Sequence, residues 1–236
     1  MSSRSFRALC AVASIAVTLF AVAPLAQQRE HSETPREQWQ RVPDILRELG
    51  AASGAHVADL GAGSGFFTTR IAKAVGPAGK VYAVDVNPVS LRELKAALGT
   101  DVTNVDVIRG DEDNPHLPEG RLDGVLVVNA YHEFAEYGAM LAHIRKALKP
   151  GGRFVIVEPI PRRADDTSRQ AQTKRHSIAM SFVEEDLKQA GFEIVTRDAG
   201  FVTRPEHQTD AERASGAATP TEWLLVARPR ADNRSF

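Results

Sequence analysis

Cysteine is almost absent from this sequence, and so is any long run of one charge. Cys10, in the N-terminal segment, is the single cysteine among 236 residues. The sequence beyond that segment therefore offers no disulfide, no thiolate nucleophile and no thiolate metal site. With 29 basic and 30 acidic residues and no basic cluster, it also gives no indication of a nucleic-acid partner or of binding to an anionic membrane surface.

Repeats and low-complexity tracts are also absent. Apolar residues make up 43% of the chain and charged residues 25%, which is typical of a globular protein with a real core. The length leaves room for one α/β domain and a short appendage. We therefore expect a single domain over residues 27–236, with a core at about 35–228, and a separate N-terminal segment.

The N-terminal segment has the composition of a targeting signal. Arg4 and Arg7 precede an uncharged, apolar run over residues 8–26, and the sequence then turns abruptly polar. These are the parts of a secretory signal peptide, which we expect to be cleaved after Ala26. The alternative is an uncleaved helix that anchors the protein in a membrane. Either way, we expect export to the periplasm or another extracytoplasmic compartment, with no stable membrane partner beyond this segment.

The remaining sequence alternates between strand-like and helix-like segments. Strands are predicted at 56–61, 80–86, 105–110, 122–130 and 153–159, and the segments FEIVTRDA and TEWLLVARP add two more. The runs GVLVVNA and FVIVEP are almost continuously apolar, as in parallel strands covered on both faces. The predicted fold class is therefore α/β, a doubly wound, mostly parallel seven-stranded sheet with helices on both faces. In such a sheet, ligands bind at the carboxyl ends of the strands.

Local signals predict where several helices begin and end. Asn87 followed by proline predicts a helix start, and a capping box predicts another at Ser181. The helix expected over about 134–148 is followed by Lys-Pro-Gly-Gly at 149–152, which predicts a stop and a turn. The polar stretch over 203–220 is predicted to be a loop.

The loop after the first predicted strand is rich in glycine. Gly61, Gly63 and Gly65 would let the chain turn tightly and let a ligand approach the backbone. A dinucleotide fingerprint requires a further glycine at the sixth position of this pattern, where the sequence has Phe66. The bulky side chain disfavours an NAD-dependent oxidoreductase.

Other features of the sequence accompany this loop in a fixed order. Asp59 opens the pattern D-x-G-x-G-x-G, Asp85 ends the second predicted strand, and Gly110-Asp111 follows the third. The segment LKPGGRFVIVEP leads into the fifth strand. In this order, the features resemble those of class I S-adenosylmethionine-dependent methyltransferases of the small-molecule type.

The resemblance implies an enzyme that binds S-adenosyl-L-methionine and transfers its methyl group to a small molecule. It assigns Asp85 to the two ribose hydroxyls, a task that suits the two oxygens of a carboxylate, and Asp111 to the adenine side. The full set of cofactor-binding residues that we expect is Asp59, Gly61, Gly63, Gly65, Asp85, Asp111 and Asn129.

Candidates for acting on the acceptor follow the fourth and fifth strands. His132 is the first candidate for a general base, because an imidazole titrates near neutral pH; the alternative is that it belongs to a helix start. Glu158 and His176 are further candidates, each with the alternative of an exposed polar residue. His132, Glu133, Glu158 and His176 could also bind a metal, but no recognised ligand spacing is present, so no metal is expected.

A second function remains open from the sequence. An exported protein could keep this fold as a non-catalytic binding protein, because S-adenosylmethionine is made in the cytoplasm. The intact glycine loop and Asp85 argue against it, since a fold kept only for its shape needs no ribose-binding acid.

Overall fold

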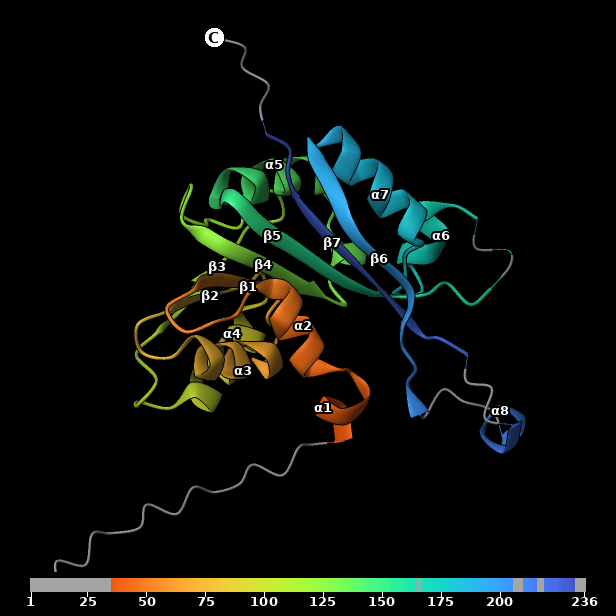
Figure 1. The fold of residues 1–236 in the computed structure, drawn as a ribbon, viewed down its shortest axis with the longest axis horizontal. Coiled ribbons are helices and arrows are strands. Elements are labelled where there is room, and N and C mark those ends of the chain that lie inside the picture. The colour runs from red at the N-terminus through yellow and green to blue at the C-terminus, as the bar shows by residue number, and fades with distance from the viewer. Residues whose placement is uncertain (1–34, 164, 166, 206–209, 216–218, 232–236) are drawn as a thin grey trace, which may run out of the picture. The chain divides into compact units, whose positions relative to one another are not determined.

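A single mixed β-sheet organises the part of the chain described by the computed structural model, which comprises residues 35–231 except 164, 166, 206–209 and 216–218. Its strands are β1 (His56–Leu60), β2 (Lys80–Asp85), β3 (Val105–Arg109), β4 (Leu122–Val128), β5 (Leu148–Pro159), β6 (Phe192–Val202) and β7 (Glu222–Pro229). They lie in the order β3-β2-β1-β4-β5-β7-β6 (Figure 1).

The first five strands run parallel to one another, whereas β7 is antiparallel to both β5 and β6. Only β7, which lies between β5 and the edge strand β6, therefore runs opposite to the other strands. The predicted fold class, a mostly parallel seven-stranded sheet with helices on both faces, is confirmed.

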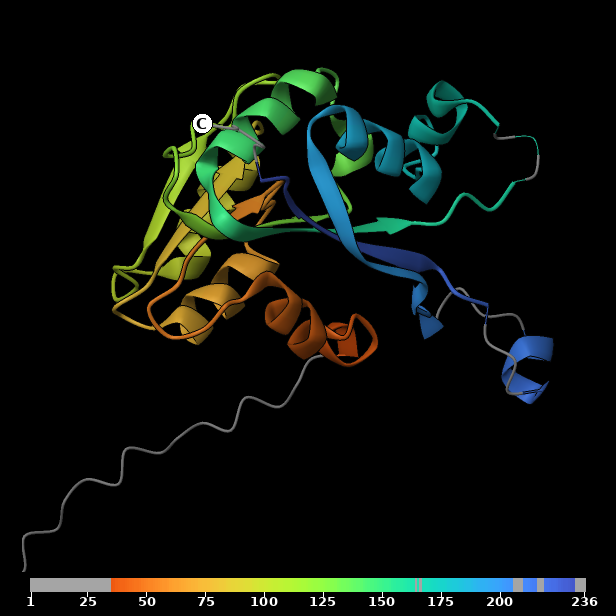
Figure 2. The ribbon, with the colours of Figure 1, turned by 45° about the horizontal axis from the view of Figure 1, so that its top comes forward.

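Helices cover both faces of the sheet. The described helices are α1 (Pro35–Trp39), α2 (Val42–Leu49), α3 (Phe66–Val75), α4 (Pro88–Leu98), α5 (Tyr137–Ala147), α6 (Arg169–Thr173), α7 (Met180–Gln189) and α8 (Asp210–Ser215), with a 3-10 turn, η1 (Tyr131–Glu133). The first four lie on one side of the sheet, and α5, α6 and α7 lie on the other (Figures 1 and 2).

Alternate residues of the central strand β4 belong to two different cores. Leu126 packs with Ile45 of α2 and Ile71 of α3, and all three are fully buried. Val127 belongs to the opposite core, which also contains Ile144 of α5. Burying one such side chain contributes ~1.5–3 kcal/mol. This burial on both faces is why the β4 sequence is apolar at nearly every position.

Three local predictions are wrong. The helix expected from about 134 begins only at Tyr137, behind η1. Residues 149–152 lie inside β5, where the pairing with β4 shifts in register, so Lys-Pro-Gly-Gly forms an irregularity in a strand and not a turn outside it. Helix α7 begins one residue before Ser181, with Ala179 as its N-cap, and no side chain caps it.

The polar stretch over 203–220 is not entirely loop, because it contains the short helix α8. The predicted signal peptide or anchor over residues 1–26 lies outside the described residues. Within the described part of the chain, no helix combines the length and the apolar character that crossing a membrane requires.

Candidate functional site

The loops after β1, β2 and β4 meet at one edge of the sheet, because adjacent parallel strands end together. Leu60 at the end of β1 pairs with Val84, and Val128 at the end of β4 pairs with Val157. The residues that follow these strands build two hollows at this edge.

The glycine loop after β1 depends on backbone conformations that other residues adopt at a cost. Gly61, Gly63 and Gly65 have φ values of 78°, 55° and 94°. A Cβ added to Gly61 would lie 2.4 Å from the Cβ of Ala130, so glycine is needed for the loop to pack beside the end of β4. A Cβ added to Gly63 would meet no atom within 4 Å, because this part of the loop faces open space.

Asp85, at the end of β2, anchors the glycine loop. Its Oδ2 accepts a hydrogen bond from the backbone N–H of Gly63 over 2.8 Å, and its Oδ1 accepts one from Asn87 over 2.8 Å. Each carboxylate oxygen has a second lone pair. Asp85 can therefore hold the loop and still accept hydrogen bonds from the two hydroxyls of a ribose.

The first hollow is a cleft of about 170 Å³ beside Asp85. Its lining consists of Leu60, Gly61, Val84, Asp85, Val86, Gly110, Asp111, Glu112, Ala130, Glu133, Phe134, Ala135 and Met140. Four of these residues are acids and most of the others are apolar, which fits a nucleoside with a polar sugar and a flat base. The residues present therefore fit the adenosine part of S-adenosylmethionine.

Asp59 is buried, with 3% of its surface exposed, and it does not line this cleft. Its Oδ2 accepts a hydrogen bond from the hydroxyl of Thr68 over 2.6 Å, in the first turn of α3. Burial raises the pKa of Asp59 to about 6, against the lowering effect of the Thr68 hydrogen bonds. Asp59 therefore binds the first turn of α3, which follows the glycine loop, and does not contact the cleft.

The other two predicted cofactor residues lie in different places. Asp111 lines the cleft, as expected, and its Oδ2 lies 2.8 Å from Nε2 of His116. Asn129 lines the second hollow instead. The apolar lining residues Val86 and Phe134 were missed. The sequence signal for Val86 is its place directly after the acid that ends β2.

The second hollow is a cavity of about 500 Å³ on the far side of Glu133, which lines both hollows. The residues around it are Asn129, His132, Glu133, Pro159, Ile160, Arg162, Arg163, Arg175, His176, Ser177, Arg204 and Thr221. Sequence reasoning missed its arginines, which come from segments far apart in the chain. The structure brings His132 and His176 together here, and it places Glu158 behind them.

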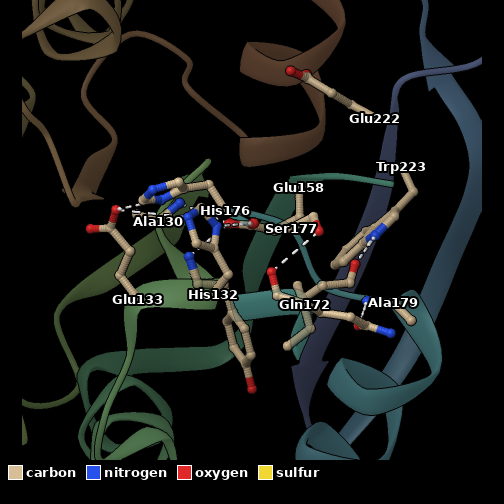
Figure 3. Close-up of polar contacts among 12 residues, drawn as sticks. Ala130, His132, Glu133, Glu158, Gln172, His176, Ser177, Ala179, Glu222 and Trp223 are labelled. Carbon is tan, nitrogen blue, oxygen red and sulfur yellow. Dashed lines mark hydrogen bonds and ion pairs between the residues drawn. The ribbon is translucent and has the colours of Figure 1, made fainter. Parts of the chain in front are cut away.

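His132 and Glu158 form a buried pair (Figure 3). Nδ1 of His132 lies 2.6 Å from Oε2 of Glu158, and their side chains are only 3% and 0% exposed. Oε1 of Glu158 accepts hydrogen bonds from the backbone N–H groups of Ala130 and Tyr131, over 2.7 and 2.6 Å. Glu158 therefore fixes both the ring and the backbone turn that carries it, without reaching the cavity.

The pKa values of this pair follow from burial and from their contact. Burial alone would lower the pKa of His132, but the hydrogen bond and charge of Glu158 and the charge of Glu133 raise it. Burial raises the pKa of Glu158, against the opposing effect of His132 and the two backbone donors. A carboxylate only accepts hydrogen bonds, so Nδ1 of His132 carries a proton. The other ring nitrogen, Nε2, lies on the side of the cavity.

Two buried polar atoms at the cavity have no hydrogen-bond partner among the described residues, namely Nε2 of His132 and Oδ1 of Asn129. Asn129 also has a positive φ of 54°, which is uncommon outside glycine. An unpaired buried polar atom costs ~1–3 kcal/mol. Both atoms would gain a partner from a ligand in the cavity.

The chain matches known methyltransferases over part of its length. Residues 57–152 match a family model described as a methyltransferase domain. The demethylmenaquinone methyltransferase of Lactococcus lactis is 30% identical over 114 residues, 48% of this chain and 45% of that protein. The chain therefore spans less than half the length of this curated relative.

Solved structures resemble the chain over most of its length. A SAM-dependent methyltransferase from Aquifex aeolicus has a TM-score of 0.65 at 21% identity, covering 83% of this chain and 93% of that one. A protein titled a [4+2]-cyclase has a TM-score of 0.63 at 18% identity, covering 84% and 85%. The fold alone therefore does not define the reaction.

The fold is that of the class I methyltransferases. The matched domain and the curated relative make this chain similar to methyltransferases over part of its length, and the structural neighbours show the fold. The cleft beside Asp85 is the place in the structure that suits S-adenosylmethionine.

Proposed function

We propose that the protein transfers the methyl group of S-adenosylmethionine to a small molecule bound in the cavity beside His132. The observation that carries this proposal is the arrangement of the two hollows, which share Glu133. A cofactor held in one of them would present its methyl group toward the other. A cavity of about 500 Å³ lies within the usual range for small-molecule sites.

Cofactor binding would rest on the glycine loop, Asp85 and Asp111. The cofactor supplies an already activated methyl group, so the protein has mainly to position the acceptor and keep its attacking atom free. Asp59 would act indirectly, because it holds Thr68 and the start of α3 below the loop.

His132 is the residue that we expect to activate the acceptor. Its Nε2 is buried, faces the cavity and has no hydrogen-bond partner among the described residues. A neutral imidazole there would take the proton of an acceptor hydroxyl or amine. Glu158 is a positioning residue, because it holds Nδ1 of His132 from behind. His176 lies at the cavity mouth, with a side chain 78% exposed.

The acceptor should be sought among two kinds of small molecule. The Lactococcus relative is named for action on demethylmenaquinone, so a reduced naphthoquinone is the first compound to try. Four arginines line the cavity, Arg162, Arg163, Arg175 and Arg204. Arg163 pairs with Asp165 and Arg204 with Glu222, but the set still favours an acceptor that carries negative charge. Small aromatic carboxylates and phosphates therefore form the second set.

Export remains part of the proposal. Residues 1–26 would direct the chain out of the cytoplasm as a signal peptide, or hold it at the membrane if they are not removed. Cell fractionation with N-terminal sequencing tests this. A full-length chain found only in the cytosol, with Met1 intact, would contradict export.

Calorimetry with S-adenosylmethionine and a screen of acceptors for release of S-adenosylhomocysteine test the proposed reaction. We expect the protein to bind S-adenosylmethionine and not NAD. We also expect turnover with at least one acceptor. Failure to bind S-adenosylmethionine would overturn the proposal. Binding without turnover across both acceptor sets would favour the exported, non-catalytic binding protein.

A further inference from the structure

Three donor atoms converge at the mouth of the cavity. Oε1 of Glu133 lies 3.7 Å from Nε2 of His132 and 3.8 Å from Nδ1 of His176, and all three donors lie within 4.8 Å of one another. Figure 3 shows the two imidazole rings turned toward the carboxylate. Adjacent residues of η1 supply two of the donors, and the segment after α6 supplies the third.

The buried member of this cluster points to a ligand. His132 has a side chain only 3% exposed, and its Nε2 has no hydrogen-bond partner among the described residues. Because Glu158 accepts a hydrogen bond from Nδ1–H, the neutral form of the ring carries its lone pair on Nε2. A histidine held in this way by a carboxylate is the usual arrangement of a metal-ligating imidazole, since it fixes the ring and raises its basicity.

We propose that His132, Glu133 and His176 bind a divalent transition metal ion of the zinc type, with an open coordination position toward the cavity. Donors around a tetrahedral zinc ion lie about 3.4 Å apart, whereas these donors are 3.7 and 3.8 Å apart in two pairs and within 4.8 Å in the third, so they have to move closer to bind the ion. The side chains of Glu133 and His176 are 63% and 78% exposed, which lets them move. Two imidazoles and one carboxylate are a donor set that suits zinc.

The charges around the site both oppose and favour the binding of a cation. The arginines of the cavity lining repel a cation, whereas Glu133 contributes a negative charge directly and Glu158 contributes one through His132. The negative charges of these two carboxylates compensate the charge of a divalent ion in this cavity. An anionic acceptor would offset the remaining positive charge.

The consequence for the reaction rests on the proposed function. A metal ion at this position would coordinate the hydroxyl oxygen of the acceptor and lower the pKa of that hydroxyl, so that its proton is lost to water before the oxygen attacks the methyl group. His132 would then activate the acceptor as a ligand of the metal and not as the base itself. No regular ligand spacing is visible in the sequence, because the third donor lies on a segment that only the fold brings close.

Titration of the purified, chelator-treated full chain with Co²⁺, followed by visible absorption, tests the proposal without any acceptor. We expect one Co²⁺ per chain with the strong absorption of a four- or five-coordinate ion, displaced by Zn²⁺. His132→Ala and His176→Ala should each lose this spectrum and weaken binding by at least about tenfold. His143→Ala is the matched control, because His143 lies on α5 and does not line the cavity.

The exposed position of His176 keeps the test informative even if the buried His132 variant fails to fold. Absence of Co²⁺ binding in the wild type, or equal binding by His176→Ala, would overturn the metal proposal. Calorimetry with S-adenosylmethionine on the same samples separates the two proposals. Cofactor binding without Co²⁺ binding removes only the metal, whereas Co²⁺ binding without cofactor binding removes the methyl-transfer function.

Discussion

The backbone N–H of Gly63 donates a hydrogen bond to Oδ2 of Asp85, linking residues 22 positions apart. The glycine loop after β1 and the acid at the end of β2 are thereby one structural unit. Asn87 donates to the other oxygen of the same carboxylate. Asp85 is thus oriented by two backbone donors before any ligand arrives, which reduces the entropy that a ligand must offset.

Asp85→Ala should weaken the binding of S-adenosylmethionine by about 1–3 kcal/mol, because it removes charge-assisted hydrogen bonds to the ribose. Isothermal titration calorimetry measures this directly. Asp106→Ala is a matched control, since Asp106 is an acid on the neighbouring strand β3 that pairs with Lys80 and does not line the cleft. Unchanged affinity in Asp85→Ala, or an equal loss in both variants, would contradict the assignment of Asp85.

Gly61→Ala should destabilise the protein more than Gly63→Ala. Both positions have positive φ, which costs an alanine ~1–2 kcal/mol. At Gly61 the new Cβ would also lie 2.4 Å from the Cβ of Ala130, whereas at Gly63 it would meet open space. Overpacking of this kind adds ~1–3 kcal/mol. Urea unfolding of the two variants measures the difference, and equal stabilities would mean that the chain relaxes freely at Ala130.

Asp59→Asn should change the dependence of stability on pH. The pKa of Asp59 is raised by burial to about 6 in the folded protein, from an ordinary value of 3.8. Between these pH values the folded chain binds more protons than the unfolded chain, so the free energy of unfolding falls as the pH rises. The contribution of Asp59 is present in full below about pH 4 and is lost by the time the pH has passed about 6.

The asparagine variant keeps the shape of the side chain but does not titrate. Its stability relative to the wild type should therefore rise by about 2–3 kcal/mol between pH 4 and pH 7.5. Any constant cost of the amide cancels, because the comparison is between two pH values. Urea unfolding at both values provides the measurement. A pH-independent difference between the two proteins would show that folding does not raise the pKa of Asp59.

The fold could be predicted because its signals are local. Strand β4 is apolar at nearly every position because it is buried on both faces, and Asn87 caps α4 by accepting a hydrogen bond from Val89 over 2.8 Å. The start of α7 could not be predicted in this way. The N–H of Ala179 donates to the side chain of Gln172, which comes from another helix. A contact set by tertiary structure therefore determined a helix boundary that the sequence pattern placed at Ser181.

The residues of the candidate site likewise fall into those with a local signal in the sequence and those that only the fold brings together. Gly61 and Asp85 lie in short, recognisable segments, so their places at the cleft could be expected. Glu158 was expected to act on the acceptor, but it lies behind His132, because the direction of a side chain at the end of β5 depends on how β4 and β5 pair. The arginines of the cavity had no signal in the sequence, since they lie in three separate segments, after β5, after α6 and after β6, that only the fold brings together.

His132 should affect turnover much more than cofactor binding. It lines the cavity but not the cleft beside Asp85, and its Nε2 faces the place of the acceptor. His132→Ala and His132→Gln should therefore each keep the affinity for S-adenosylmethionine and lower turnover by about 10²–10⁴-fold. The measurement is release of S-adenosylhomocysteine with the acceptor found in the screen, beside cofactor calorimetry on the same preparations.

Glu158→Gln provides the matched test of positioning. The glutamine can still accept the hydrogen bonds of Ala130 and Tyr131 through its oxygen, but its NH₂ group would donate to Nδ1 of His132 and move the imidazole proton to Nε2. The lone pair that faces the acceptor would be lost while the fold and the cofactor cleft remain. The variant should then resemble His132→Gln in kcat, with KM for S-adenosylmethionine unchanged. Full turnover in both variants would make the pair a structural feature of η1, and the search for the activating group would move to His176 and Glu133.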